Sequence, residues 1–180
     1  MTMRKFVEAI EGEYGRYKSL AEAAVEQLSD DQLQIGLAGG NSVAIIVQHI
    51  AGNLKSRFTD FLTTDGEKPW RDRESEFTKP STDRPALLAQ WEDGWQSVIA
   101  ALAVLVDGDL DRTVAIRGVP LSVAQALQRS LAHTAYHVGQ IVLVARGIRG
   151  ADWRYLSIPP GQSAKYNANP TREKTPRSRS

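Results

Sequence analysis

Four segments of the chain repeat apolar residues in steps of three and four, and this periodicity is the strongest constraint on the fold. Such a repeat places the apolar side chains along one face of an α-helix. The segments lie within residues 1–28, 42–61, 83–105 and 122–145. Four amphipathic helices of this length predict an all-α four-helix bundle, because each helix must bury its apolar face against the others.

The polar residues between these segments predict where helices begin and how they connect. Ser42 or Asn41, Thr82 or Asp83, and Ser122 can each cap a helix, and a glutamine three residues after Ser122 completes a capping box. About twenty residues, "TTDGEKPWRDRESEFTKPST", separate the second and third helices. A linker of that length can cross the bundle, which predicts an up-down-down-up topology. The segment "TVAIRGVPLSV" predicts a small hairpin before the fourth helix.

The chain is predicted to divide into a bundle over residues 1–150, an extended arm over 151–169 and a disordered basic tail over 170–180. The arm carries apolar residues that can pack on the bundle, namely Trp153, Tyr155, Leu156 and Ile158. The tail is the single feature that favours nucleic-acid binding. Because 22 basic residues are nearly matched by 21 acidic ones, we interpret the tail as a solvated end and expect no nucleic-acid partner.

Composition excludes several kinds of chemistry and location. The chain has no cysteine, so disulfides, thiolate nucleophiles and cysteine-based metal sites are absent. No stretch approaches the roughly 18 apolar residues of a membrane helix, and the N-terminus does not resemble a secretory signal. The sequence therefore predicts a cytoplasmic protein without a membrane partner.

The three histidines are the leading candidates for a site. His133 and His137 are four residues apart, so they project from the same face of the fourth helix. His49 lies on or beside the inner face of the second helix. Three neutral imidazoles without a thiolate suit Zn²⁺, Ni²⁺ or another late divalent ion, and they leave one position for water or substrate.

Each histidine also has a simpler interpretation. A single buried histidine is usually a hydrogen-bonded core residue, and an HxxxH pair occurs often by chance. The HExxH motif of metalloproteases is absent, because Thr134 occupies the position of its glutamate. A general base would have to come from elsewhere in the protein, from the metal-bound hydroxide or from the substrate.

Several polar residues could support a metal or a substrate. Asn53, Ser130 and Thr134 could orient a ligand or a water, although the two hydroxyls could equally bond to the preceding turn. Gln140 lies three residues after His137, and it could approach the same cavity or be an ordinary solvated residue.

The long linker offers a second candidate site. Trp70, flanked by Lys68, Arg71 and Arg73, could form a lid that recognises an anionic substrate. The interpretation we favour from the sequence is that Pro69 and Trp70 anchor the crossover while the charges face water.

The stretches "VQHIAGN" and "HTAYHVGQI" resemble the three-histidine pattern of the DinB/YfiT-like superfamily of four-helix-bundle metalloproteins. The stretches "RFTDFLTTDGEKPWRDR" and "YLSIPPGQSAKYN" resemble a bacterial branch of unassigned function, and the match spans most of residues 1–169. The resemblance implies metal ligation by His49, His133 and His137, a homodimer, and chemistry with low-molecular-weight thiols. Many relatives carry a basic residue after the last histidine, where this chain has Val138.

These observations lead to two functional hypotheses. The first is a metal-dependent enzyme that acts on a small molecule, as a hydrolase or a thiol-dependent transferase, with the ion as Lewis acid. The second is a non-catalytic, stress-associated or structural protein stabilised by metal or dimerisation. A substrate-sized cavity that opens onto the histidines would favour the first hypothesis.

Overall fold

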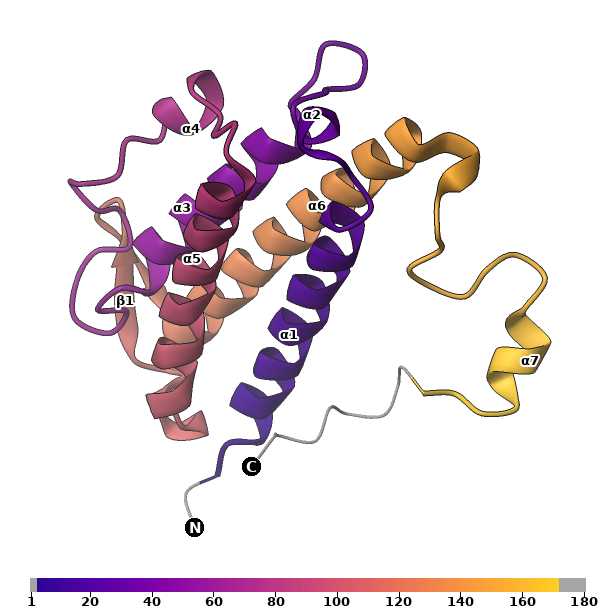
Figure 1. The fold of residues 1–180 in the computed structure, drawn as a ribbon. Helices are drawn as coiled ribbons and strands as arrows, with labels where there is room; N and C mark the ends of the chain where they lie inside the picture. The colour runs from indigo at the N-terminus through magenta and orange to yellow at the C-terminus, as the bar shows by residue number, and fades with distance from the viewer. Residues whose placement is uncertain (1–2, 172–180) are drawn as a thin grey trace.

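A computed structural model describes residues 3–171, which are mostly helical with one small two-stranded sheet (Figure 1). The predominantly helical fold predicted from the periodicity is confirmed. The helices are α1 Lys5–Val25, α2 Asp30–Leu33, α3 Val43–Phe58, α4 Ser75–Thr78, α5 Arg84–Val104, α6 Val123–Arg149 and α7 Ser163–Asn167; the strands are β1 Thr113–Ile116 and β2 Val119–Ser122. Short 3₁₀ turns occur at Asp107–Asp109 and Gly150–Asp152.

The helices α3, α5 and α6 each begin at one of the predicted capping residues. The side chain of Ser42 accepts a hydrogen bond from the backbone amide of Ile45 at the start of α3, and Asp83 caps α5 in the same way. Ser122 and Gln125 form the predicted capping box of α6. Helix α6 continues four residues beyond the predicted end, to Arg149, and is followed by Gly150, whose φ of 55° suits a residue without a side chain.

Contacts between the long helices establish their directions. The guanidinium of Arg4, before α1, donates to the carbonyl of Leu105 at the end of α5, so these two helices are antiparallel. Gly94 in the middle of α5 meets Ala51 in the middle of α3, and the two helices run the same way from the α4 end of the molecule (Figure 1). Helix α6 runs antiparallel to α3. The long linker therefore crosses between two parallel helices, as its length predicted.

One apolar core joins the four long helices. Helix α3 packs on α5 and α6, and α1 packs on α6. The rings of Trp91 and Trp95 are buried in this core. Leu87 of α5 and Val138 of α6 are also fully buried in it.

The long linker and the hairpin are bound to each other at one end of the core. Arg117 and Gly118 form the turn between β1 and β2 with φ angles of 56° and 72°, as a two-residue hairpin turn requires. The carboxylate of Asp65 accepts hydrogen bonds from the backbone amides of both residues, at 2.8 and 2.7 Å. This contact fixes the linker and the hairpin beside the N-terminal end of α6.

The first residues of the C-terminal segment, which follow α6, pack on the core. Trp153 is 9% exposed, and Gln27 of the α1 end bonds to both backbone groups of Arg154. The predicted extended arm thus contains a packed start, a 3₁₀ turn and the short helix α7. The predicted basic tail, residues 170–180, lies outside the described residues except for its first two positions. None of the described helices combines the length and the apolar character needed to cross a membrane.

Candidate metal centre

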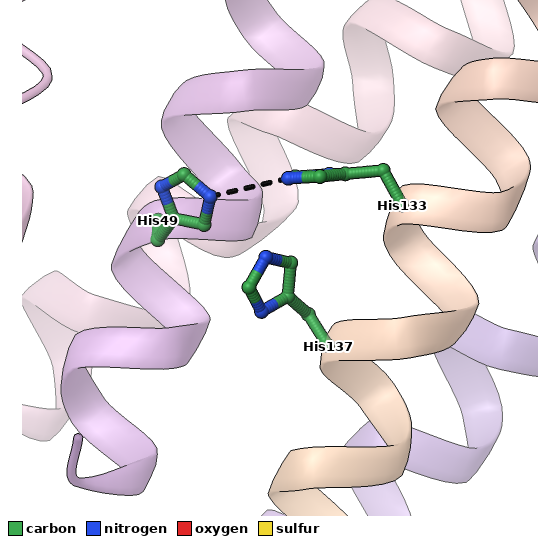
Figure 2. A group of neighbouring side chains, drawn as sticks. All are labelled: His49, His133 and His137. Carbon is green, nitrogen blue, oxygen red and sulfur yellow. Dashed lines mark hydrogen bonds between the residues drawn. The ribbon is translucent and has the colours of Figure 1, made fainter. Parts of the chain in front are cut away.

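The three histidines of the chain meet between α3 and α6 (Figure 2). One ligand nitrogen from each of His49, His133 and His137 lies within 4.8 Å of the other two. The Nε2 atoms of His49 and His133 are 3.3 Å apart. Two nitrogens bound to a tetrahedral ion at about 2.0–2.1 Å are separated by about 3.3 Å. The predicted convergence is confirmed, and the group could hold a metal ion.

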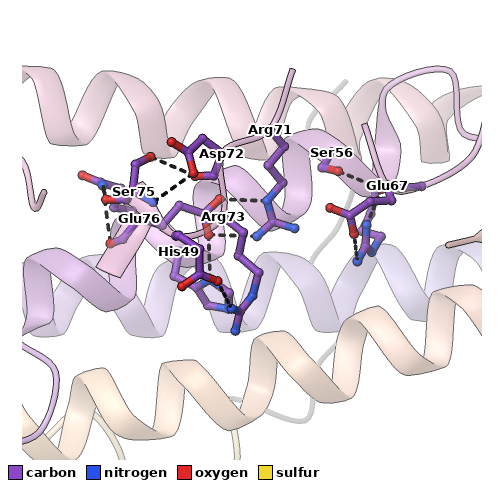
Figure 3. A network of polar contacts seen from close by, with 12 residues as sticks. His49, Ser56, Glu67, Arg71, Asp72, Arg73, Ser75 and Glu76 are labelled. Carbon is purple, nitrogen blue, oxygen red and sulfur yellow. Dashed lines mark hydrogen bonds and ion pairs between the residues drawn. The ribbon is translucent and has the colours of Figure 1, made fainter. Parts of the chain in front are cut away.

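A carboxylate from the long linker fixes the ring of His49 (Figure 3). His49 Nδ1 donates to Glu76 Oε2 at 2.8 Å, and Arg71 donates to both oxygens of the same carboxylate at 2.7 and 2.9 Å. Burial raises the pKa of Glu76, but the hydrogen bonds and charges of His49 and Arg71 outweigh it and hold the pKa below its ordinary value. A carboxylate on Nδ1 leaves Nε2 as the ligand atom, a common arrangement at metal sites.

The structure also explains how Glu76 reaches α3. Gln48 holds the short helix α4, because its amide donates to the carbonyl of Lys79 at 3.2 Å and accepts from the amide of Ser81 at 3.0 Å. Gly52 makes room for the carboxylate, since a Cβ at this position would lie 2.3 Å from Glu76 Oε1. Glu76 is therefore built into the site by residues on both sides of His49.

The two histidines of α6 have different environments. Gln140 Oε1 accepts from His137 Nδ1 at 2.7 Å, so the Nε2 of this ring is left for a ligand bond. Burial, and to a smaller extent the neighbouring histidines and the charges of Arg71 and Arg57, together lower the pKa of His133 to about 3. Burial likewise lowers the pKa of His137. Both rings are neutral near pH 7, as metal ligands must be.

The donor set fits a late divalent ion. The Nδ1 of His49 already donates to a carboxylate, so the nitrogen that it turns toward His133 is an acceptor in the neutral ring. His133 Nε2 lies within hydrogen-bond distance of this acceptor, so either a proton on His133 or a cation can occupy the space between the two atoms. Imidazole nitrogens with no thiolate favour Zn²⁺ or Ni²⁺.

A cavity of about 390 Å³ opens onto the histidines. All three rings line it, together with Asn53, Ser130 and Gln140, which the sequence placed near the site. Among the lining residues in the described part of the chain, five are arginines and none is acidic: Arg57, Arg71, Arg73, Arg117 and Arg129. The cavity is thus large enough for a small molecule and strongly cationic.

Two predicted candidates lie away from the cavity. The ring of Trp70 is half exposed, and Lys55 lies over it at 5.8 Å. Trp70 is therefore neither a lid over the histidines nor a buried anchor. Thr134 is fully buried behind the site, and its hydroxyl has no hydrogen-bond partner among the described residues. Arg71, in contrast, is buried in the site rather than facing water.

The sequence analysis missed Glu76 and three of the arginines. Glu76 lies in a four-residue helix within an aperiodic linker, where no pattern distinguishes it from its neighbours. A signal was present for the arginines: Arg57 is eight residues after His49, and Arg129 is four residues before His133. Both lie on the same helical faces as the histidines.

Fold and site together define the class as a mostly helical protein with a three-histidine group able to hold a metal ion beside a cationic cavity. The model of the DUF1572 family, a family of proteins of unknown function, matches residues 1–162. The chain therefore belongs to the DUF1572 family. No curated protein and no solved structure matches the chain.

Proposed function

We propose that this protein is a four-helix-bundle metalloenzyme of DinB/YfiT type that acts on a small molecule, as a hydrolase or a thiol-dependent transferase. One observation carries the proposal: the three histidines converge at the wall of a cavity of about 390 Å³ rather than in a sealed core. The order and directions of the long helices support the same bundle type, as does the resemblance of the histidine segments to that superfamily.

The open cavity favours catalysis over a structural role. A structural ion is enclosed by four protein ligands, whereas a catalytic ion keeps a position for water or substrate. Here three side chains converge, and His133 and His137 remain partly exposed on the cavity side. The alternative of a metal that merely stabilises the bundle has no comparable observation in its favour.

The protein side chains prepare the site by orientation. Glu76 and Gln140 each accept a hydrogen bond from the Nδ1 of a histidine, so that His49 and His137 present their Nε2 atoms. A bound Zn²⁺ or Ni²⁺ would supply Lewis acidity, which lowers the pKa of water or a thiol by several units. Asn53, which is 9% exposed at the cavity wall, can orient a water or substrate by hydrogen bonding.

Metal analysis tests the proposal. The purified protein should contain close to one Zn²⁺ or Ni²⁺ per chain, and the double variant His133→Ala, His137→Ala should contain almost none. Arg146→Ala is the matched control, because Arg146 is on the same helix but lies over Tyr155 instead of the cavity. Equal metal content in the wild type and the double variant would refute the site. A metal-dependent turnover screen with thiols and electrophiles, and with hydrolysable esters and amides, then identifies the reaction.

The homodimer and the cytoplasmic location remain predictions. The dimer has a candidate surface on α6, where Leu143 is 67% exposed and Tyr136, which also lines the cavity, is 64% exposed two helical turns earlier. Large apolar side chains exposed together on one helix face are typical of an interaction surface.

A further inference from the structure

Each of the two helices that carry the histidines also carries an arginine, at a distance of one or two helical turns from a histidine. On α3, Arg57 lies two turns after His49. On α6, Arg129 lies one turn before His133. Because α3 and α6 are antiparallel, both arginines lie at the hairpin end of the cavity, while the histidines lie toward the α4 end. The cavity therefore has a metal-binding end and a cationic end.

The positive charge of the cavity wall is only partly compensated. Arg57 and Arg117 share the carboxylate of Glu67, at 3.2 and 2.9 Å. Arg71 pairs with Glu76, and Arg73 with Glu74. Five arginines thus face three glutamates, and Arg129 has no ion pair or hydrogen bond with any residue in the range that the structure describes. Asp65, whose carboxylate accepts from the backbone amides of Arg117 and Gly118, adds a fourth negative charge beside this wall, so the excess of positive charge is small but remains.

A buried hydrogen-bond donor in this wall has no partner. The side chain of Arg71 is 2% exposed, and its Nε and Nη2 atoms bond to Glu76 (Figure 3). Its Nη1 atom is buried and has no hydrogen-bond partner among the described residues. A buried charged donor without a partner is costly, so its position at a cavity wall indicates an acceptor that arrives with a ligand.

The arginines are also close enough to repel each other. Burial lowers the pKa of Arg57, and the positive charges of Arg71 and Arg117 lower it further, although Glu67 opposes this effect. Like charges that are held together in a concave, partly desolvated site favour the binding of an anion, which relieves the repulsion.

We propose that the cavity binds an oxyanion, a carboxylate or phosphate group of the substrate, through Arg57 and Arg129 at the hairpin end and through Arg71, which pairs with Glu76 nearer the histidines. This inference rests on the proposed function and specifies its substrate class. Guanidinium groups suit such ligands, because their N–H groups match the geometry of two oxygens on one acid group.

The helix geometry sets the size of the substrate. At 1.5 Å per residue, Arg57 is about 12 Å along α3 from His49, and Arg129 is about 6 Å along α6 from His133. Arginine side chains can shorten this separation. The substrate should therefore carry its acid group several bonds away from the group that reacts at the histidines.

Binding of non-reactive probes tests the proposal without requiring activity. The probes are phenylphosphonate, benzoate and, as the uncharged control, benzamide. Their dissociation constants are measured by calorimetry on the double variant His133→Ala, His137→Ala after treatment with a chelator that is then removed by dialysis, so that neither a metal nor the chelator competes for the anion. At least one of the two anions should bind, its affinity should fall with added salt, and benzamide should bind more than tenfold more weakly.

Arginine variants made in the same background locate the binding. Arg129→Gln should weaken anion binding by about tenfold or more, because a charge-assisted hydrogen bond is lost while no internal ion pair is broken. Arg146→Gln, on the same helix outside the cavity, should leave the affinity unchanged within twofold. Equal effects of the two variants, equal binding of benzamide, or binding of neither anion would overturn the proposal. Metal content of the parent protein is an independent measurement, so failure of the metal site and failure of the anion site give different results.

Discussion

The carboxylate of Glu76 and the imidazole of His49 are joined by a hydrogen bond of 2.8 Å, although 26 residues separate them in the chain. Both side chains are more than nine-tenths buried. The bond connects the long linker to the three-histidine group, so the linker does more than lead from one helix to the next. It supplies the partner that selects the ligand atom of His49.

Replacement of this carboxylate should weaken metal binding. Glu76→Gln keeps the size of the side chain but removes the charge that orients His49, and loss of such a partner typically lowers metal affinity by about 10- to 100-fold. Glu74→Gln is the control, because Glu74 is two residues away with its side chain 81% exposed. Competition with a chelator for Zn²⁺ measures both affinities. Equal values for the two variants would show that Glu76 does not support the site.

Substitution of Gly52 should affect the same bond indirectly. A Cβ at position 52 would meet the end of the Glu76 side chain, so Gly52→Ala should displace the carboxylate while leaving the helix intact. We expect the Zn²⁺ affinity of Gly52→Ala to fall toward that of Glu76→Gln. The double variant Gly52→Ala, Glu76→Gln should bind Zn²⁺ no more weakly than the Glu76→Gln single variant. Additive losses in the chelator competition would mean that Gly52 acts independently of Glu76.

Much of the fold could be predicted because it depends on local patterns. Apolar residues at helical spacing identified the four long helices, and Ser42, Asp83 and Ser122 identified their starts. The linker length predicted that α3 and α5 run in parallel. The helices α2, α4 and α7 have four or five residues each, too few for a periodic signal. Their formation depends on contacts with distant parts of the chain.

The site was predicted as far as the helices alone determine it. His133 and His137 share a face of one helix, and the inner face of α3 brings His49 opposite them. Glu76 could not be placed, because its position depends on how Gln48 holds an irregular linker. The predicted topology already made α3 and α6 antiparallel, so Arg57 and Arg129 could have been placed at one end. The other arginines of the cavity, Arg71, Arg73 and Arg117, depend on how the linker and the hairpin pack against these helices.

The contact between α3 and α5 should be intolerant of any added atom. A Cβ at Gly94 would lie 2.6 Å from the carbonyl oxygen of Ala51, which belongs to a helix backbone and cannot move cheaply. Gly94→Ala should therefore lower the free energy of unfolding by about 1–3 kcal/mol. Gly15→Ala, in α1 with no atom near the added Cβ, should raise it by about 0.5–1 kcal/mol. Denaturant unfolding measures both changes, and a stabilising Gly94→Ala would contradict the described packing.

The metal-free protein should lose stability in mild acid through His133. The pKa of this ring is lowered to about 3 in the folded protein, mainly by burial, and stands near 6.5 in an unfolded chain. The unfolded chain therefore binds a proton that the folded protein does not, and stability falls as the pH drops from 6.5 toward 3. The free energy of unfolding is measured with denaturant in the presence of a chelator. As the pH is lowered from 7 to 4.5, the stability of His133→Gln should increase relative to that of the wild type. Ser130→Ala removes no titrating group, so its difference from the wild type should stay constant. A constant difference for His133→Gln as well would contradict the lowered pKa.

The exposed face of α6 should carry the contact between two copies of the chain. Leu143 is 67% exposed there, and burial of such a side chain at an interface is favourable, whereas an arginine would bring a charge into the same place. We expect the wild type to elute as a dimer in size-exclusion chromatography with light scattering, and Leu143→Arg to elute as a monomer at the same concentration. Ile99→Arg is the matched control, because Ile99 is also an exposed apolar residue but lies on α5, so the dimer should persist. A monomeric wild type would refute the dimer. Dissociation by Ile99→Arg but not by Leu143→Arg would show that the interface lies elsewhere than on α6.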